Sequence, residues 1–176
     1  GTGGLSLATS GVGSGTLAVV STGGDITQTG ALTQEAAAGA TSFNAGANAI
    51  TLTQANDFTG TVALTGGVTQ ITDANALTLG ALATGNLTAT STGALNLGSG
   101  TVPGALVANS NGGAISQAGG LPVTGTSGLT ATGAAITLTQ ATNDFQGTVT
   151  ATGTGIQITD ANALTTVLTD GGASTL

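Results

Sequence analysis

The only side chains in this sequence that could act as acids or bases are carboxylates. The 176 residues include seven Asp and Glu and no Lys, Arg, His, Cys or Tyr. A Ser, Thr or Cys nucleophile would therefore lack its usual His or Lys base. Zinc and copper sites would lack their usual nitrogen and sulfur ligands. What remains is paired carboxylate chemistry of the glycosidase type, which needs two carboxyl groups about 5 to 9.5 Å apart.

Two pairs of aspartates share one spacing. The interval in the chain from Asp57 to Asp73 is the same as the interval from Asp144 to Asp160. This interval is shorter than the coil period of about 21 residues derived below, so we do not expect the members of a pair to stack directly, although wide loops could bring them together. We interpret each aspartate as a turn or cap residue that accepts main-chain hydrogen bonds. Because sugar-binding sites favour Trp and Tyr platforms, which are absent, a polysaccharide-degrading enzyme is only a second alternative.

The same corners contain the oxygen atoms that calcium would use. Asp73 with Asn75, or Asp160 with Asn162, could supply carboxylate and amide ligands. Neither an EF-hand loop nor a Gly-Gly-x-Gly-x-Asp repeat is present, so we favour turn hydrogen bonds over calcium. Glu35, the only glutamate, is expected on a solvated loop. The sequence therefore predicts no catalytic, cofactor-binding or metal site and no enzymatic activity.

Charge and hydropathy limit the partners. The net charge is −7, and without a cation the chain cannot neutralise phosphates, so we expect no nucleic-acid binding. A polybasic membrane contact is excluded for the same reason. No apolar run approaches the roughly 20 residues of a membrane-spanning helix. The mean hydropathy of +0.40 and 4% charged residues favour folding over disorder.

Internal repetition is the most informative feature of the sequence. Matching segments recur at an offset of about 88 residues, which indicates two related cassettes, about 1–88 and 89–176. The matching segments are 23–28 with 112–117, 50–55 with 136–141, 56–58 with 143–145, 60–62 with 147–149, and 71–78 with 158–165. We predict that residues 1–176 form a single segment of a longer shaft or fibre.

A shorter period lies inside each cassette. Apolar–polar–apolar triplets recur at intervals of about 21 residues, and Gly, Asn or Ser bound them, as in short strands between turns. The triplets begin at Ile50, Ile71, Leu95, Ile115, Ile136 and Ile156. No sustained helical pattern of apolar residues is present, and glycine interrupts the chain too often for helices.

These periods predict an all-β fold, a right-handed parallel β-helix of about eight coils with about 20–22 residues each. At about 4.8 Å per coil the column would be about 40 Å long. We expect inward Leu, Ile and Val to form ladders, Phe58 and Phe145 to occupy equivalent places, and Gly and Asn to supply positive-φ corners. Two immunoglobulin-like sandwiches, one per cassette, are the alternative, although the buried Trp and Tyr typical of their cores are absent.

Residues 54–62 (QANDFTGTV) and 71–79 (ITDANALTL), with their counterparts 143–149 and 160–164, resemble the repeats of filamentous-haemagglutinin-like large exoproteins of Gram-negative bacteria. The resemblance to these two-partner-secretion adhesins implies a β-helical shaft. It also implies export through an outer-membrane transporter barrel, an extracellular or cell-surface location, and a role in adhesion to host cells or a biofilm matrix. The family's N-terminal secretion domain is not evident, so export by this route is inferred for a parent polypeptide.

Threonine pairs suggest a different function, ice binding. Thr-x-Thr arrays on one flat face of a solenoid can present methyl and hydroxyl groups to ice. The pairs are Thr51 and Thr53, Thr88 and Thr90, Thr130 and Thr132, Thr137 and Thr139, and Thr148 and Thr150. Because threonine is also the ordinary outward residue of a strand, and the pairs flank different strand signals, ice binding remains the alternative. We expect foremost a passive extracellular rod, without membrane insertion, that could associate end to end because no polar caps are evident at its ends.

Overall fold

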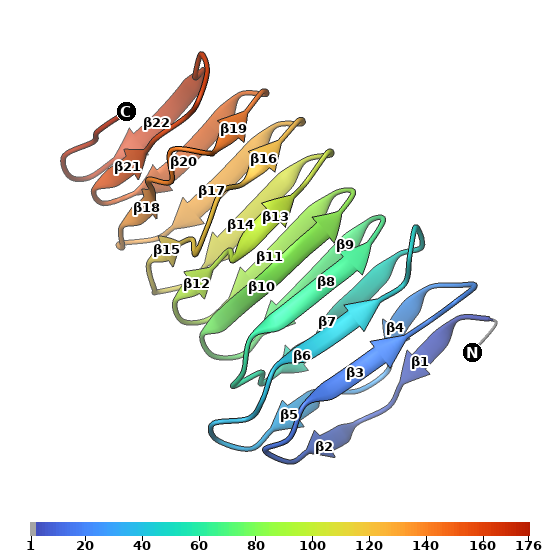
Figure 1. Ribbon diagram of the computed structural model, residues 1–176. Coiled ribbons are helices and arrows are strands. Elements are labelled where there is room, and N and C mark those ends of the chain that lie inside the picture. The colour runs from blue at the N-terminus through green and yellow to red at the C-terminus, as the bar shows by residue number, and fades with distance from the viewer. Residues whose placement is uncertain (1–2) are drawn as a thin grey trace.

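Short alternating segments form the strands of this protein, as the sequence pattern predicts. The computed structural model describes residues 3–176, and these contain 22 strands of two to eight residues and no helix. In Leu106–Ser110, for example, every second side chain is buried. Every strand pairing among the described residues is parallel. The fold is thus a parallel β-solenoid of about eight turns, and paired antiparallel sandwiches are excluded (Figure 1).

Each coil has three sides, which we name in chain order. Face 1 is a continuous sheet of nine strands. Its strands are β1 (Leu5–Leu7), β4 (Ile26–Gln28), β7 (Ile50–Asn56), β9 (Thr69–Asp73), β11 (Leu87–Ser91), β14 (Leu106–Ser110), β17 (Ser127–Ala131), β20 (Val149–Gly153) and β22 (Thr166–Asp170).

Face 2 follows face 1 in each coil, and face 3 closes the coil. Face 2 contains β2 (Ser10–Val12), β5 (Leu32–Gln34), β12 (Leu95–Asn96), β15 (Ile115–Ser116), β18 (Ile136–Leu138) and β21 (Ile156–Ile158). Face 3 contains β3 (Leu17–Val20), β6 (Thr41–Asn44), β8 (Val62–Gly66), β13 (Ser99–Thr101), β16 (Pro122–Val123) and β19 (Asp144–Phe145). The long strand β10 (Leu77–Thr84) belongs to both, since it pairs with β12 at one end and with β8 and β13 at the other.

Coil length varies more than the sequence period predicts. On face 1 the longest coil runs from Ile26 to its partner Ile50, and the shortest runs from Val149 to its partner Thr166. The extra or missing residues lie at corners and at bulges, because the strands must stay in register with those of the neighbouring coils. The predicted number of coils is confirmed, and the predicted length of about 20–22 residues holds for some coils, while others are shorter or longer.

Inward side chains form one continuous apolar core along the axis. Leu, Ile and Val ladders predominate, and Phe43, Phe58 and Phe145 are all at most 2% exposed. The rings of Phe43 and Phe58 meet edge to face, with centroids 5.9 Å apart. Because each inward residue packs on its equivalents above and below, the predicted ladders are confirmed.

The two cassettes are rotated by one face relative to each other. Ile50 lies in β7 on face 1, whereas its counterpart Ile136 lies in β18 on face 2. Val62 lies on face 3, and its counterpart Val149 lies on face 1. The stretch from Ile50 to Ile136 therefore covers four coils and one further side. For this reason the evenly spaced triplets of the sequence do not form one ladder: Ile71 belongs to face 1, and the triplets that begin at Leu95 belong to face 2.

Glycine accounts for nearly all of the described residues with positive φ, and all but Gly100 of β13 lie outside the strands. Six glycines have this conformation, at Gly46, Gly98, Gly100, Gly112, Gly133 and Gly155. Ala37, with φ of 58°, is the one other example among the described residues. The prediction that Asn shares this role is wrong. The asparagines serve the corners through side-chain hydrogen bonds instead, and these bonds form the most extensive polar site of the molecule.

Candidate functional site

A buried asparagine organises the corner where face 1 meets face 2 in the first cassette. Asn56, at the end of β7, is 0% exposed. Its Nδ2 donates to Oε1 of Gln28 (3.0 Å) and to the carbonyls of Leu52 (3.1 Å) and Thr72 (3.0 Å). Its Oδ1 accepts from Nε2 of Gln28 (2.8 Å) and from the main-chain N–H of Leu32 (2.9 Å). Every hydrogen-bonding group of this side chain is thus paired inside the protein.

Asp73 extends this network to the next coil. It lies at the end of β9, pairs with Asn56 in register, and is 0% exposed. One carboxylate oxygen accepts from the main-chain N–H of Phe58 (2.7 Å) and the other from that of Asn75 (2.8 Å). Burial raises the pKa of Asp73, the two main-chain hydrogen bonds lower it, and the negative charge of Asp57 raises it. We call Gln28, Asn56 and Asp73 the first corner network.

The second cassette contains the same network. Asn143 Nδ2 donates to Gln117 Oε1 (2.9 Å) and to the carbonyls of Leu138 (3.1 Å) and Thr159 (3.0 Å). Its Oδ1 accepts from Gln117 Nε2 (2.8 Å) and from Leu121 N–H (3.0 Å). Gln117, Asn143 and Asp160 form the second corner network, which joins three consecutive coils as the first one does.

Asp160 completes the second network in the same way as Asp73 completes the first. Its carboxylate accepts from the main-chain N–H of Phe145 (2.7 Å) and of Asn162 (3.1 Å). Asp160 is half-buried, whereas Asp73 is fully buried. The interpretation of both aspartates as turn and cap residues is confirmed by these bonds.

The spacing shared by the two aspartate pairs places the members of each pair in neighbouring coils. A register shift between Leu52 and Asn56 in β7 places Asn56, and not Asp57, opposite Asp73. The expectation that Asp57 and Asp73 do not stack directly is therefore correct, but they lie close enough for their charges to interact. Because both oxygens of Asp73 face main-chain donors in the interior, they are directed at the fold and away from any surface ligand.

The asparagines that could have served as calcium ligands make turn hydrogen bonds. Asn75 and Asn162 each donate a main-chain N–H to the aspartate two residues earlier, which closes an Asx-type turn. The Nδ2 of Asn162 also donates to Asp144 (3.1 Å). Within residues 3–176 no three His, Cys, Asp or Glu groups gather in a possible metal site.

Asp170 closes the last coil by a similar device. Its carboxylate accepts from the main-chain N–H of Gly155 (2.7 Å) and of Gly172 (2.9 Å) and from the hydroxyl of Ser174. These hydrogen bonds, above all that of Ser174, lower the pKa of Asp170 to about 2. Aspartate at the end of a strand is therefore a recurrent corner acceptor in this solenoid.

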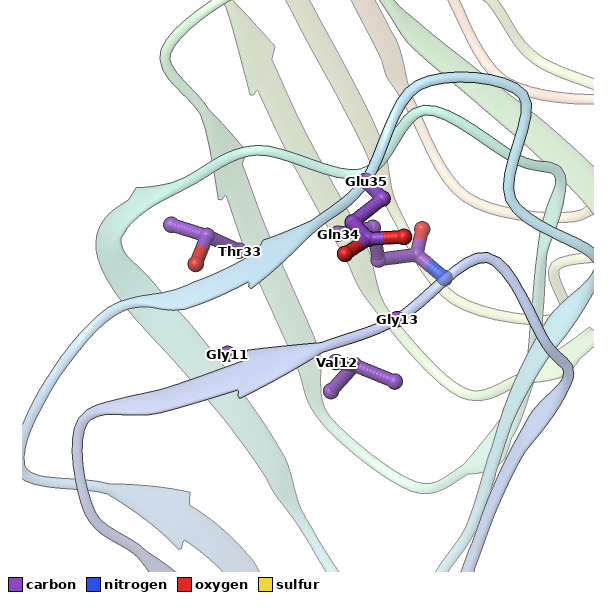
Figure 2. Close-up of a pocket in the computed structure, with 6 residues that line it drawn as sticks. All are labelled: Gly11, Val12, Gly13, Thr33, Gln34 and Glu35. Carbon is purple, nitrogen blue, oxygen red and sulfur yellow. The ribbon is translucent and has the colours of Figure 1, made fainter.

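One surface depression lies between β2 and β5 on face 2. It has a volume of about 300 Å³ and is lined by Gly11, Val12, Gly13, Thr33, Gln34 and Glu35 (Figure 2). The amide of Gln34 is already engaged, since its Nε2 donates to Thr41 Oγ1 (3.0 Å). Glu35 is exposed after β5, as predicted, and is the one carboxylate in the lining. A single carboxylate does not supply the pair that glycoside hydrolysis requires.

The threonine pairs do not form the two-column array that would favour ice binding. One outward column of face 1 is nearly all threonine in six consecutive coils: Thr72, Thr90, Asn109, Thr130, Thr152 and Thr169. The neighbouring column is mixed, with Gln70, Thr88, Val107, Gly128, Thr150 and Val167. From β9 to β22, threonine occupies both columns only in β11 and β20, which are not neighbouring strands. The pair that includes Thr137 lies on another side of the column, face 2.

The sequence identifies only part of these networks. Asp73 and Asp160 are predicted corner acceptors, whereas Gln28 and Asn56 carry no predicted role. The sequence feature that could have identified them is the asparagine that recurs in both cassettes, as Asn56 and Asn143. A helix long and apolar enough to cross a membrane is absent from residues 3–176.

Comparison with known proteins agrees with a repeat architecture. No curated protein and no solved structure matches the chain. The family described as repeats of unknown function (DUF5649) matches residues 1–65 and 84–152, which together make up more than half of the sequence. These two stretches include both asparagines at the centres of the corner networks. The chain therefore belongs to the DUF5649 family of repeats.

Proposed function

We propose that this chain is a segment of a passive extracellular rod, the shaft of an adhesin or biofilm-matrix filament. The observation that carries the proposal is the repeated corner network. Each copy joins three consecutive coils through a buried asparagine and its partly or fully buried glutamine and aspartate neighbours, and their polar groups are paired within the fold. The side chains of the corner networks therefore stabilise the stacked coils. Because their polar groups point to partners inside the fold, they are poorly placed to bind a ligand at the surface.

Strand pairing along the axis gives the rod its stiffness. Face 1 joins nine strands in one sheet, so each coil is tied to the next by several main-chain hydrogen bonds that must break together when two coils separate. At about 4.8 Å per coil, eight coils extend for about 38 Å. With no Lys or Arg the chain also offers trypsin no cleavage site. These properties suit a filament outside the cell.

The location and export route in this proposal come from the resemblance to filamentous-haemagglutinin-like exoproteins. We propose that a parent polypeptide is exported through an outer-membrane transporter barrel and displayed on the surface of a Gram-negative cell. Its partners there would be host-cell or matrix surfaces. The lack of cations is the reason that we propose no nucleic acid and no membrane insertion.

A display experiment tests this role. The chain is placed behind a two-partner secretion domain, coexpressed with its barrel partner in a Gram-negative host, and attachment of the cells to epithelial and abiotic surfaces is measured. We expect surface display and increased attachment over cells that display the secretion domain alone. Efficient display without any gain in attachment would refute the adhesive part of the proposal. Release of reducing sugars from polysaccharides by the purified chain would refute its passive character.

End-to-end association is also part of the proposal. Leu5 and Leu7 in the first coil and Leu168 in the last pack against the core but remain half exposed. A further coil stacked on either end, from the same polypeptide or from a second copy, would cover them. Electron microscopy of the purified chain at rising concentration should show fibres that lengthen by addition at their ends. Rods of unchanged length at every concentration would argue against it.

A further inference from the structure

The solenoid contains a junction at which one cassette follows the other. Strands β12, β13 and β14 of the second cassette stack on residues of the first cassette, and they cover faces 2, 3 and 1 in turn. In three outward or inward positions the register is fixed by strand pairing: Leu95 lies over Leu77, Thr101 over Ala83, and Val107 over Thr88. We call this contact the cassette junction.

The strands at the N-terminal end, β1, β2 and β3, are the counterparts of β12, β13 and β14. β1 pairs with β4 as β12 pairs with the equivalent strand β15, and β3 pairs with β6 as β14 pairs with the equivalent strand β17. The main-chain N–H groups of Ser10 in β2 and Gly100 in β13 donate to the equivalent carbonyls of Ala31 and Gly120. The correspondences are Leu5 with Leu95, Gly11 with Thr101, and Ala18 with Val107.

The strands at the C-terminal end are the counterparts of the residues below the cassette junction. β22 pairs with β20 as the second half of β10 pairs with the equivalent strand β8. Thr175 bridges to Gln157 as Thr88 pairs with the equivalent Gln70. The correspondences are Leu164 with Leu77, Thr169 with Ala83, and Thr175 with Thr88.

We propose that a second copy of this chain stacks on the first in the register of the cassette junction. This inference rests on the end-to-end association in the proposed function and specifies its geometry. Strands β1, β2 and β3 of the second copy lie over residues 164–165, β22 and residues 174–176 of the first. The resulting contacts are Leu5 over Leu164, Gly11 over Thr169, and Ala18 over Thr175.

The second copy is turned by one face relative to the first. Leu164 lies on face 3, because it stands between β21 of face 2 and β22 of face 1. Face 1 of the second copy therefore continues face 3 of the first, which repeats the turn between the two cassettes. Without this turn, β1 would lie over β22 and face 3 would lack one strand at the contact. Each copy advances the fibre by about eight and two-thirds coils, or about 42 Å.

Apolar side chains at both ends fit this register. Leu176 is 63% exposed and corresponds to Ala89, which is buried at the cassette junction. Val19 of the second copy lies over Leu176 and removes it from water. Leu5 and Leu164 each pack against the core of their own copy but are only partly buried, and in this register they cover each other.

Charge does not oppose the contact. Residues 5–20 contain no charged side chain, and residues 164–176 contain only Asp170. The carboxylate of Asp170 already accepts hydrogen bonds from Gly155 and Gly172 of its own copy. Two copies, each with a net charge of −7, therefore meet with little repulsion at these ends.

One difference in coil length lies at the contact. The stretch 164–168 is one residue shorter than its counterpart 77–82, on which the second cassette stacks. The solenoid already accommodates a difference of this size between stacked strands. β10 has one residue more than β8 where these strands pair, at the register shift between Leu79 and Leu82.

Single cysteines test the register, because the chain has no cysteine of its own. A18C with T175C, and G11C with T169C, would place two outward cysteines on neighbouring strands about 4.8 Å apart, which suits a disulfide. The swapped mixtures, A18C with T169C and G11C with T175C, contain the same four variants and are the matched controls.

Each mixture is oxidised at high protein concentration with one variant labelled with 15N, and the disulfide-linked heterodimer is measured by intact mass spectrometry. We expect about 10-fold or more heterodimer in the two matched mixtures than in the swapped ones, whose cysteines lie on different sides of the column. Circular dichroism of each variant confirms that the solenoid is folded.

The other outcomes separate this inference from the association on which it rests. Preferential linkage of G11C with T175C would show that copies stack without the turn, which overturns the inference and leaves end-to-end association in place. Equal linkage in all four mixtures would overturn the inference, since random collision explains it. A lack of heterodimer in every mixture would overturn both the register and end-to-end association, while the display experiment still tests the shaft.

Discussion

The first and second corner networks have the same hydrogen bonds on different sides of the solenoid. The first joins strands β4, β7 and β9 of face 1, and the second follows β15, β18 and β21 of face 2. The equivalent distances agree within a few tenths of an ångström, from Asn56 or Asn143 to its glutamine, to two carbonyls and to one main-chain N–H. The local sequence therefore specifies the corner and not the side of the column on which the corner stands.

The surroundings of the two networks differ where the sequences differ. The offset between the cassettes is larger at Leu32 and Leu121 than at Ile50 and Ile136, so the first cassette has three more residues at the corner after β5. The first cassette also pairs Phe43 with Phe58, whereas Leu129 stands at the position equivalent to Phe43 in the second. Each difference gives a test of which features the network needs.

The largest expected effect is the loss of a central asparagine. Asn56→Ala or Asn143→Ala would remove the side-chain partner of a buried main-chain N–H and of two main-chain carbonyls, while the glutamine amide keeps its bonds to neighbouring main-chain groups. Because each unsatisfied buried group costs about 1 to 3 kcal/mol, each variant should lose about 3 kcal/mol or more of unfolding free energy. Chemical denaturation measures this loss.

The comparison between the two asparagines is the sharper test. Since both side chains are 0% exposed and make equivalent bonds, the two losses should agree within about 1 kcal/mol. Gln70→Ala, at an exposed outward position, is the control and should change stability by less than about 0.5 kcal/mol. A large loss for Asn56 alone would show that the second network is dispensable.

A smaller difference is expected between the two buried phenylalanines that follow the asparagines. Phe58→Leu removes an edge-to-face partner of Phe43, whereas Phe145→Leu removes a ring without an aromatic neighbour. Phe58→Leu should therefore cost about 0.5 to 1.5 kcal/mol more than Phe145→Leu. In a Phe43→Leu background this excess should vanish. An excess that persists in that background would attribute it to packing volume and not to the ring pair.

Much of the fold was predictable from residue types. The apolar–polar–apolar triplets at 50–52 and 136–138 and the glycine boundaries predict short strands, and the match of 71–78 with 158–165 predicts stacked repeats. The turn role of Asp73 and Asp160 follows from the preference of aspartate for main-chain N–H donors. These properties depend on a few neighbouring residues, which is why the sequence alone predicts them.

The arrangement of faces was not predictable in the same way. The triplets recur at nearly even intervals, but Ile71 and Leu95 lie on different faces because coils of unequal length shift the phase. The bonds of Asn56 to Gln28, in the preceding coil, depend on that phase. A residue's partner 28 positions away cannot be assigned until every coil length between them is known.

A substitution in the longer corner after β5, which only the first cassette has, is expected to increase stability. Ala37 has φ of 58°, a conformation that costs about 1 to 2 kcal/mol for an L-residue and little for glycine. Ala37→Gly should therefore stabilise the protein, by up to about 1 kcal/mol after the entropy of the added glycine is counted. Ala36→Gly next to it, without positive φ, should destabilise slightly. Stabilisation by both substitutions would contradict this explanation.

The smallest expected effect is a dependence of stability on pH that comes from Asp73 in the first corner network. Burial and the charge of Asp57 raise the pKa of Asp73, so the folded state holds this proton more tightly than the unfolded state, whose aspartate pKa is about 3.9. The stabilisation from Asp73 is therefore complete below that value and is lost as pH rises through the folded pKa. Relative to Asp73→Asn, the wild type should gain stability as pH falls from about 7 to about 3.5.

The charge of Asp57 provides a check on the cause. Asp57→Asn removes one of the two influences that raise the pKa of Asp73, so the gain on acidification should shrink in that background. Asp170, whose pKa is lowered to about 2, acts in the opposite sense but is present in every protein compared and cancels from the differences. Denaturation at several pH values measures the differences directly. A wild type that loses stability relative to Asp73→Asn on acidification would mean that the two main-chain donors, and not burial, control this carboxylate.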